Sequence, residues 1–194
     1  MLHDLLIKNI KKHVQLSDTE VERICNYFEP KVIEKRSFLL TQGSIYKYEG
    51  FVLEGCFRIF TTDKKGNENT LYFATKDWWL IDIDSFMNQH PSDLNIQALE
   101  DSKVLLIKKV DKMELYNSLP VVEKLFRIMS QKALVAWQRR LIRNHSLTAE
   151  ERYHHFIQTY PEIASKLTDR QISSYLGITH EFLSKIKRKN TKTE

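Results

Sequence analysis

The segment from Asp169 to Arg188, DRQISSYLGITHEFLSKIKR, has the spacing of two short helices joined by a tight turn. Gly177 lies between the two parts, and a glycine adopts without strain the left-handed conformation that ends a helix. Thr179 is then the N-cap of the second helix, and the small Ser173 lets the two helices approach closely. Apolar residues recur at helical spacing on both sides of the glycine: Ile172, Leu176, Ile178, Leu183 and Ile186. The segment therefore predicts a helix-turn-helix.

The second predicted helix turns polar side chains away from its apolar side. These side chains belong to Thr179, His180, Glu181, Ser184, Lys185 and Arg188. A helix that reads bases in the DNA major groove requires such a surface. An ordinary helical hairpin is the alternative, but it does not require the small residue, the glycine and the apolar positions to agree. We therefore expect DNA binding.

The excess positive charge of the chain lies in the same part of the sequence. The chain has 30 Lys and Arg against 25 Asp and Glu, a net formal charge of +5. From Gln138 onward there are 11 basic and 6 acidic residues, which leaves 19 of each in the first 137 residues. A basic terminal segment on a neutral body is typical of a protein that binds phosphate. A solvated basic tail would explain Lys187–Lys192 but not the apolar spacing before it.

Between about Lys31 and Lys109 the hydrophobic pattern has a period of two, in short runs separated by glycine turns. The predicted strands are Val32–Ile33, Phe38–Leu40, Phe51–Leu53, Phe57–Phe60, Thr70–Phe73, Asn95–Leu99 and Lys103–Ile107. Such strands indicate an antiparallel sandwich or barrel and not a parallel sheet. The first thirty residues are helical in pattern, with a capping box of Ser17 and Glu20 at the start of the second helix.

A long helix is predicted from Pro120 to about Asn144, about 25 residues. Its apolar residues form two stripes, one of Val121, Leu125, Ile128, Val135 and Ile142 and one of Phe126, Met129, Ala133, Trp137 and Leu141. One stripe can pack on its own domain, and a second copy of the chain is the simplest cover for the other. A central helix in a monomeric bundle is the alternative, but the chain has no other long helices to surround it.

We therefore expect an α+β fold in three parts. Residues 1–118 form an antiparallel, jelly-roll-like β-roll with flanking helices, and residues 119–145 form the long dimerisation helix. Residues 146–194 form an all-α domain that contains the helix-turn-helix.

The sequence offers little evidence for an iron–sulfur protein, an exported or membrane protein, or an enzyme. Cys25 and Cys56 lack motif spacing, which indicates reduced thiols and excludes an iron–sulfur cluster held by this chain's cysteines alone. The N-terminus has no export signal and no apolar run reaches membrane-spanning length, so we expect a soluble, cytoplasmic protein. The predicted strands contain no histidine, and His154 and His155 are adjacent on a helix, where side chains point apart. We therefore expect neither a metal site nor catalysis.

A β-rich N-terminal part, a long helix and a C-terminal helix-turn-helix, in this order, resemble the Crp/Fnr superfamily of bacterial transcription regulators. Besides the helix-turn-helix, two segments carry the resemblance: Leu39–Phe60 (LLTQGSIYKYEGFVLEGCFRIF) and Asn95–Ile107 (NIQALEDSKVLLI). The resemblance implies a β-roll of the cyclic-nucleotide-binding type and a homodimer held by the long helix. It also implies binding to a palindromic operator in double-stranded DNA, with RNA polymerase as a further candidate partner.

The effector segment departs from the family pattern. Members that bind a cyclic nucleotide use Gly-Glu, whose Glu meets the ribose, and Arg followed by Ser or Thr, whose Arg pairs with the phosphate. This chain has Ile81-Asp82 and Ser92-Asp93 at those positions, and the segment from Asp77 to Leu94 contains no Lys or Arg. Because an acidic segment repels a phosphate, we do not expect cAMP as the effector, and the identity of any effector is left open.

Aromatic residues near this segment have two interpretations. Trp78, Trp79 and Phe86 would line an apolar pocket in the first, whereas core packing explains them more simply in the second. A signal sensed by the β-roll would act by shifting the long helix and with it the separation of the two reading helices.

The reading helix also has its own chemistry. Where the family uses Arg or Ser, then Glu, then Arg, this chain has His180, Glu181 and Lys185. Glu181 can accept from a cytosine amino group, and Lys185 can donate to guanine without the bidentate fork of Arg. Thr179, Lys187, Arg188 and Lys189 are predicted phosphate contacts, and His180 is either a DNA contact or a solvated surface histidine.

Two further expectations follow from the comparison with the family. Members often have a β-hairpin wing after the reading helix, for which Lys189–Glu194 are too few residues, so we expect a wingless DNA-binding domain or a slightly truncated chain. The alternative function is that of a sensor or adaptor protein whose DNA-binding module is degenerate.

Overall fold

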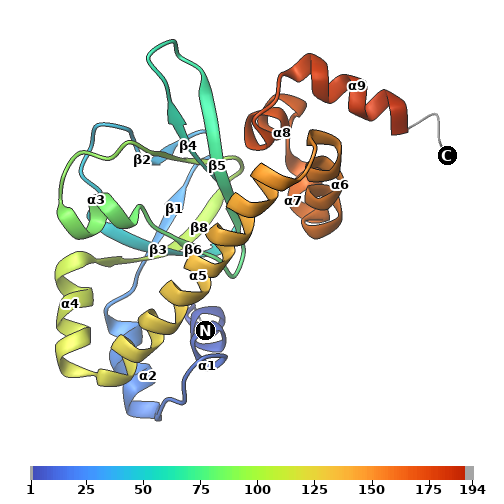
Figure 1. Ribbon diagram of the computed structural model, residues 1–194. Helices are drawn as coiled ribbons and strands as arrows, with labels where there is room; N and C mark the ends of the chain where they lie inside the picture. Colours follow the sequence, from blue (N-terminus) through green and yellow to red (C-terminus); the bar gives the residue numbers. More distant parts are fainter. Residues whose placement is uncertain (1, 191–194) are drawn as a thin grey trace.

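The computed structural model describes residues 2–190, which form a β-roll, a long helix and a helical C-terminal part (Figure 1). Two four-stranded sheets make up the roll, and all of their strand pairs are antiparallel. The first sheet has the order β1 (Glu29–Ile33), β8 (Ser102–Lys108), β3 (Tyr48–Glu54) and β6 (Trp79–Leu80). The second has the order β2 (Phe38–Leu40), β7 (Asn95–Ala98), β4 (Cys56–Thr62) and β5 (Glu68–Thr75). The antiparallel roll predicted from the period-two runs is confirmed.

Along β3 and β8, both faces of the first sheet are buried. Alternate residues of β3 and β8 point in opposite directions, as the pleat of a strand requires. Val52 and Val104 face the second sheet, whereas Phe51 and Leu105 face the flanking helices. Large side chains fill the space between the sheets: Tyr46, Phe57, Ile59, Phe86 and Ile96.

The turn between β3 and β4 requires Gly55, which lies in the segment Leu39–Phe60 that resembles the Crp/Fnr superfamily. Gly55 has a φ of +100°, and a Cβ atom at this position would lie 2.8 Å from the backbone Cα of Ser102. Any other residue would be strained by the backbone angle and would collide with the start of β8. Glycine is therefore required here for close packing of two strands.

Helices cover the outer face of the first sheet. They are α1 (Asp4–Lys11), α2 (Asp18–Asn26), α4 (Lys109–Ser118) and the beginning of α5 (Pro120–Ser146). The predicted capping box of Ser17 and Glu20 is present at the start of α2. Trp79 lies among them, with its ring 5.1 to 6.1 Å from the rings of Phe28, Phe51 and Phe126.

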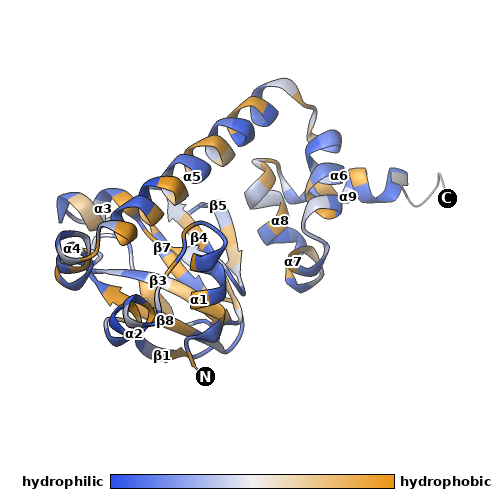
Figure 2. Ribbon diagram, turned by 90° about the horizontal axis from the view of Figure 1, so that it is seen from below, coloured by the Kyte–Doolittle hydropathy of each residue, from blue (hydrophilic) through white to orange (hydrophobic). Residues whose placement is uncertain are grey.

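The long helix α5 has 27 residues and crosses the molecule diagonally in Figure 1. Only its first part is buried against the roll, through Val122, Leu125 and Phe126. Hydrophobic and hydrophilic residues alternate along its remaining length (Figure 2). The predicted stripes did not include Val122, which is buried against the roll, or Leu134, which is 69% exposed. The buried Leu125 and Phe126 belong to different predicted stripes, so the roll covers the start of both.

Two short helices were not predicted. The acidic segment contains α3 (Ile83–Asn88), which begins where the Asp82 side chain accepts hydrogen bonds from the backbone N–H groups of Asp84 and Ser85. Pro161 begins the other, α7 (Pro161–Lys166). Proline fits the first turn of a helix because the N–H it lacks would have no intrahelical partner there.

Candidate nucleic-acid interface

Four helices form the C-terminal part. They are α6 (Ala149–Thr159), α7, α8 (Asp169–Leu176) and α9 (His180–Asn190). Threonine side chains begin three of them. Thr148 and Thr168 form capping boxes with Glu151 and Gln171, and Thr179 Oγ1 accepts from the Phe182 N–H at 3.2 Å. Each threonine thus satisfies a backbone donor that the first turn of a helix leaves without a partner.

The turn between α8 and α9 has the predicted geometry. Gly177 is left-handed, with φ 66° and ψ 38°, and the Ile178 N–H returns to the Ser173 carbonyl oxygen at 3.1 Å. The two helices then pack through buried apolar side chains: Ile172, Leu176, Leu183 and Ile186. Ser173 is buried between them. The helix-turn-helix prediction is confirmed as a structure.

The outer surface of α9 carries most of the predicted DNA contacts. Thr179, His180, Glu181, Lys185 and Arg188 are exposed, and Ser184 is half-buried. Hydrogen bonds from its own backbone N–H and from Thr179 lower the pKa of the Glu181 carboxyl, so this group is ionised at neutral pH. An ionised carboxylate is the acceptor that a cytosine amino group requires.

Two of the predicted phosphate contacts have partners within the chain. The Lys187 ammonium pairs with the Asp169 carboxylate of α8, and Lys189 pairs with Glu150 of α6 at 2.8 Å. Both pairs are partly solvent-exposed, so their strength is small and water or phosphate can compete for the lysines. The structure leaves Lys185 and Arg188 as the exposed cations of α9 for which no such pair is found within residues 2–190.

Phe182 of α9 is not among the contacts predicted from the sequence. It lies on α9 between Glu181 and Lys185, and 47% of its side chain is exposed. The signal was present, because Phe182 is an apolar residue outside the buried stripe. An exposed ring next to polar reading residues can contact the methyl group of thymine.

The helix-turn-helix is docked on the β-roll through Ser174 of α8. Its hydroxyl donates to the Glu68 carbonyl oxygen at 2.6 Å and accepts from the Thr70 N–H at 3.0 Å. Arg58 Nη2 also donates to it, at 3.2 Å. We call this group of Ser174, Thr70, Glu68 and Arg58 the docking contact. It connects α8 to β5 and β4 and so orients the reading helix relative to the roll.

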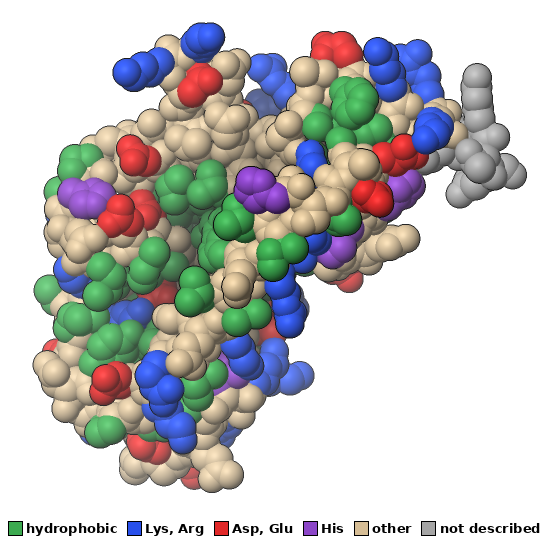
Figure 3. All heavy atoms as spheres, in the orientation of Figure 1, with side chains coloured by type: hydrophobic (Ala, Val, Ile, Leu, Met, Phe, Trp, Pro, Cys, Tyr) green, Lys and Arg blue, Asp and Glu red, His purple; other side chains and the backbone are tan. Residues whose placement is uncertain are grey.

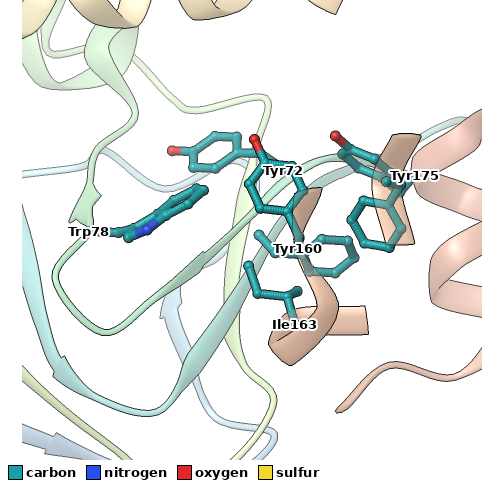
Figure 4. A pocket seen from close by; sticks show the side chains of 7 residues that line it. Tyr72, Trp78, Tyr160, Ile163 and Tyr175 are labelled. Atoms are coloured by element: carbon teal, nitrogen blue, oxygen red, sulfur yellow. The ribbon is translucent and has the colours of Figure 1, made fainter. Parts of the chain in front are cut away.

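An aromatic pocket lies beside the docking contact, between the roll and α6, α7 and α8 (Figure 4). It is partly open to solvent, and it is lined by Tyr72, Phe73, Trp78, Phe156, Tyr160, Ile163 and Tyr175. Trp78 and Tyr160 meet edge to face, with ring centroids 5.9 Å apart. The two interpretations of the aromatic residues each hold in part, since Trp79 and Phe86 are core residues and Trp78 lines a pocket.

Two of the residues at the effector positions, Asp82 and Ser92, interact with each other. Asp82 and Ser92 are buried, and the Ser92 hydroxyl donates to the Asp82 carboxylate. Ile81 is half-buried, and Asp93 is exposed. The positions that would hold the ribose and the phosphate thus hydrogen-bond to each other, and large side chains fill the space between the sheets. These residues do not fit a cyclic nucleotide, because its phosphate would meet a carboxylate and no guanidinium.

Other candidate chemistry is sparse in the described part of the chain. Within residues 2–190, no three His, Cys, Asp or Glu residues are grouped so that they could hold a metal ion. Cys25 and Cys56 are free thiols, and burial raises the pKa of Cys56 to about 11, which makes it a poor nucleophile. None of the helices between residues 2 and 190 has the length and apolar character to cross a membrane.

The chain is similar to a known domain family and to several solved structures. Residues 30–118 match the family model of the cyclic nucleotide-binding domain. No curated protein sequence matches the chain. Among solved structures, the c-di-GMP-responsive global regulator CLP of Xanthomonas campestris is similar with a TM-score of 0.75 and 12% identity, over 91% of this chain and 93% of CLP.

Two further structures have the same arrangement. FixK2 of Bradyrhizobium japonicum matches with a TM-score of 0.73 and 18% identity, over 86% of this chain and 85% of FixK2. A protein of Eubacterium rectale described as a Crp/Fnr-family transcriptional regulator matches with a TM-score of 0.72 and 15% identity, over 92% and 85% of the two chains. The chain thus contains a cyclic nucleotide-binding-type domain and has the fold of the Crp/Fnr transcription regulators.

Proposed function

We propose that the chain is a homodimeric, sequence-specific DNA-binding transcription regulator. The observation that carries this proposal is the exposed polar surface of α9, which follows a glycine turn and rests on a buried helix-turn-helix core. The fold that the chain shares with transcription regulators supports it, and no catalytic role is proposed. In this proposal α9 lies in the major groove, as the second helix of a helix-turn-helix does.

We assign roles within α9 by chemistry. Glu181 accepts from a cytosine amino group and Lys185 donates to guanine, while Phe182 contacts a thymine methyl group. Thr179 and Arg188 bind backbone phosphates at the two ends of the contact, and His180 and Ser184 complete the surface. Lys187 binds phosphate only after it exchanges its partner Asp169 for the DNA.

The proposed dimer interface is the exposed side of α5. Leu134 is 69% exposed and Leu141 58% exposed, and Val135 and Ile142 are exposed beside them. Exposed apolar residues of α3 and α4 add to this surface: Ile83, Met87 and Val110. Figure 3 shows hydrophobic side chains along α5 and over α3 and α4 on one face. A surface of this kind is typical of an interface between identical chains related by a two-fold axis.

The regulatory signal is proposed not to be a cyclic nucleotide bound in the usual way. The closed Asp82–Ser92 pair and the filled roll interior support this. A signal that altered the docking contact or the position of α5 would change the separation of the two reading helices in the dimer.

Selection of binding sites from random duplexes by the purified full chain tests the proposed function. We expect enrichment of one sequence with two-fold symmetry, with half-site centres about 34 Å apart along the DNA. Lys185→Ala should recover a different or less defined sequence, whereas Lys35→Ala, a charge-matched change at an exposed position of the roll, should recover the original one. No enrichment at all would favour the sensor or adaptor function, and an asymmetric site would contradict the dimer.

A further inference from the structure

A second pocket, which shares Phe156 and Tyr175 with the aromatic pocket, lies where the long helix meets the DNA-binding part. It is a hollow that is partly open to solvent, and we call it the arginine pocket. Its polar lining consists of Arg140, Arg143, Asn144, Arg152 and His155, and its apolar wall of Phe156, Tyr175 and Leu176. The α5 residues stand at positions i, i+3 and i+4 of one helix face, and so do the α6 residues. Two helices therefore direct basic side chains toward the same space.

No carboxylate lines this space. Arg152 donates instead to backbone carbonyl oxygens, with Nη1 2.8 Å from Leu147 O and Nη2 3.1 Å from Leu176 O. Arg140 likewise donates to carbonyl oxygens, those of Thr70 at 3.4 Å and Tyr175 at 3.3 Å, and its guanidinium lies 4.2 Å from the Tyr175 ring centroid. These contacts orient the guanidinium groups but leave their net charge uncompensated.

The Arg152 Nε atom and the Arg143 side chain have no hydrogen-bond partner among the described residues. The Arg152 Nε atom is buried, and the Arg143 side chain forms no ion pair within residues 2–190. A buried guanidinium N–H that lacks an acceptor is costly, and like charges held together destabilise the fold. Capping of the α8 carbonyl oxygens explains Arg140 and Arg152, but it explains neither Arg143 nor the free Nε.

The electrostatics of the neighbouring groups agree with a surplus of positive charge. Burial, followed by repulsion from Arg143, lowers the pKa of His155. The Nδ1 atom of His155 lies 3.4 Å from Thr159 Oγ1, so its one described hydrogen-bond partner is uncharged. Burial, with a smaller contribution from Arg143, also lowers the pKa of the Arg140 guanidinium.

We propose that the arginine pocket binds an oxyanion of the phosphate class. The anion accepts from Arg143 and from His155, and it thereby links α5 to α6 across Leu147. Guanidinium groups suit this ligand because they donate charge-assisted hydrogen bonds in a fixed planar geometry. The phosphate belongs either to a free small molecule or to the DNA backbone, and the two sources are distinguished below.

The test uses the full chain, Arg143→Gln, and Arg139→Gln as a matched control. Arg139 is the exposed neighbour of Arg140 and does not line the pocket, so both variants lose the same charge. Inorganic phosphate and pyrophosphate are titrated at constant ionic strength and without DNA, with calorimetry and NMR of the His155 ring as readouts. We expect saturable binding to the original chain and to Arg139→Gln, at least about tenfold weaker binding to Arg143→Gln, and a higher pKa of His155 when phosphate is bound.

Each outcome either identifies the source of the phosphate or contradicts an anion site in the arginine pocket. Saturable phosphate binding without DNA identifies a free oxyanion. If phosphate does not bind, a loss of about one unit in the salt dependence of DNA binding in Arg143→Gln, but not in Arg139→Gln, identifies a backbone phosphate. Equal effects of the two variants, or no effect in either assay, overturn the proposal. The phosphate titration contains no DNA, so its failure is distinct from a failure of the proposed function.

Discussion

Glu49 of β3 and Lys112 of α4 form an ion pair inside the protein, each with only 5% of its side chain exposed. The Lys112 ammonium also lies 3.7 Å from the centroid of the Phe126 ring of α5. Burial raises the pKa of the Glu49 carboxyl, and the attraction of Lys112 opposes this. This pair therefore joins the roll to the start of the long helix.

Removal of one partner of this ion pair should lower the free energy of unfolding far more than removal of both. Glu49→Gln leaves a buried ammonium without a counter-charge, and we expect it to lower the free energy of unfolding in urea by about 3–5 kcal/mol. The double variant Glu49→Gln with Lys112→Met should recover most of this loss, because no buried charge is left. A single variant as stable as the original chain would show that water reaches the pair.

Glu181 and Arg188 should differ in how their loss affects DNA binding. Glu181→Gln should relax the preference at one base pair by about 1–3 kcal/mol, because it changes a base contact. Arg188→Gln should weaken binding to all sequences alike and reduce the salt dependence by about one unit. Binding measured on the selected site and on its single-base variants separates the two effects. A uniform loss in Glu181→Gln would remove its assignment to a base.

At the scale of elements, the docking contact between α8 and β5 is held by a single hydroxyl. Ser174→Ala removes the acceptor of the Thr70 N–H, and we expect faster hydrogen exchange of the Thr70 amide and a stability loss of about 1–3 kcal/mol. Ser165→Ala on α7 is the control, because among residues 2–190 that hydroxyl bonds within its own helix, at Glu162 O. Unchanged exchange at Thr70 would show that the docking is held elsewhere.

Most elements could be predicted from the sequence because each had a local cause. The strands followed from alternation, the start of α2 from its capping box, and the turn before α9 from Gly177. The helices α3 and α7 were missed because each has only six residues and too few turns to show a period. The docking contact and the arginine pocket could not be predicted, because they join residues far apart in sequence through backbone atoms and polar side chains.

At the scale of the whole molecule, the exposed side of α5 predicts the oligomeric state. We expect the full chain to have twice the 23.1 kDa of one chain by light scattering. Leu141→Glu should yield monomers that remain folded, because this side chain is exposed within one chain. Val32→Glu places the same charge at an exposed position of β1 and should leave the dimer intact. A monomeric original chain would contradict the assigned interface.

The overall arrangement could also be predicted from the order of the segments, whereas the candidate site could be predicted only in part. The polar residues of α9 were predicted because helical spacing separates them from the buried stripe. The ion pairs of Lys187 and Lys189 could not be predicted, because their partners come from α8 and α6. The rejection of a cyclic nucleotide was argued from missing basic residues, and the structure adds the closed Asp82–Ser92 pair.

Recognition of a DNA sequence by α9 is the property on which the proposed function depends. Its most direct test is the equilibrium binding of the full chain to the selected duplex and to a shuffled duplex, measured by fluorescence anisotropy over a range of salt concentrations. We predict binding that weakens steeply with salt and that favours the selected duplex by at least about 10³-fold, with most of this preference lost in Lys185→Ala. Equal affinity for the two duplexes at every salt concentration would contradict sequence recognition by α9.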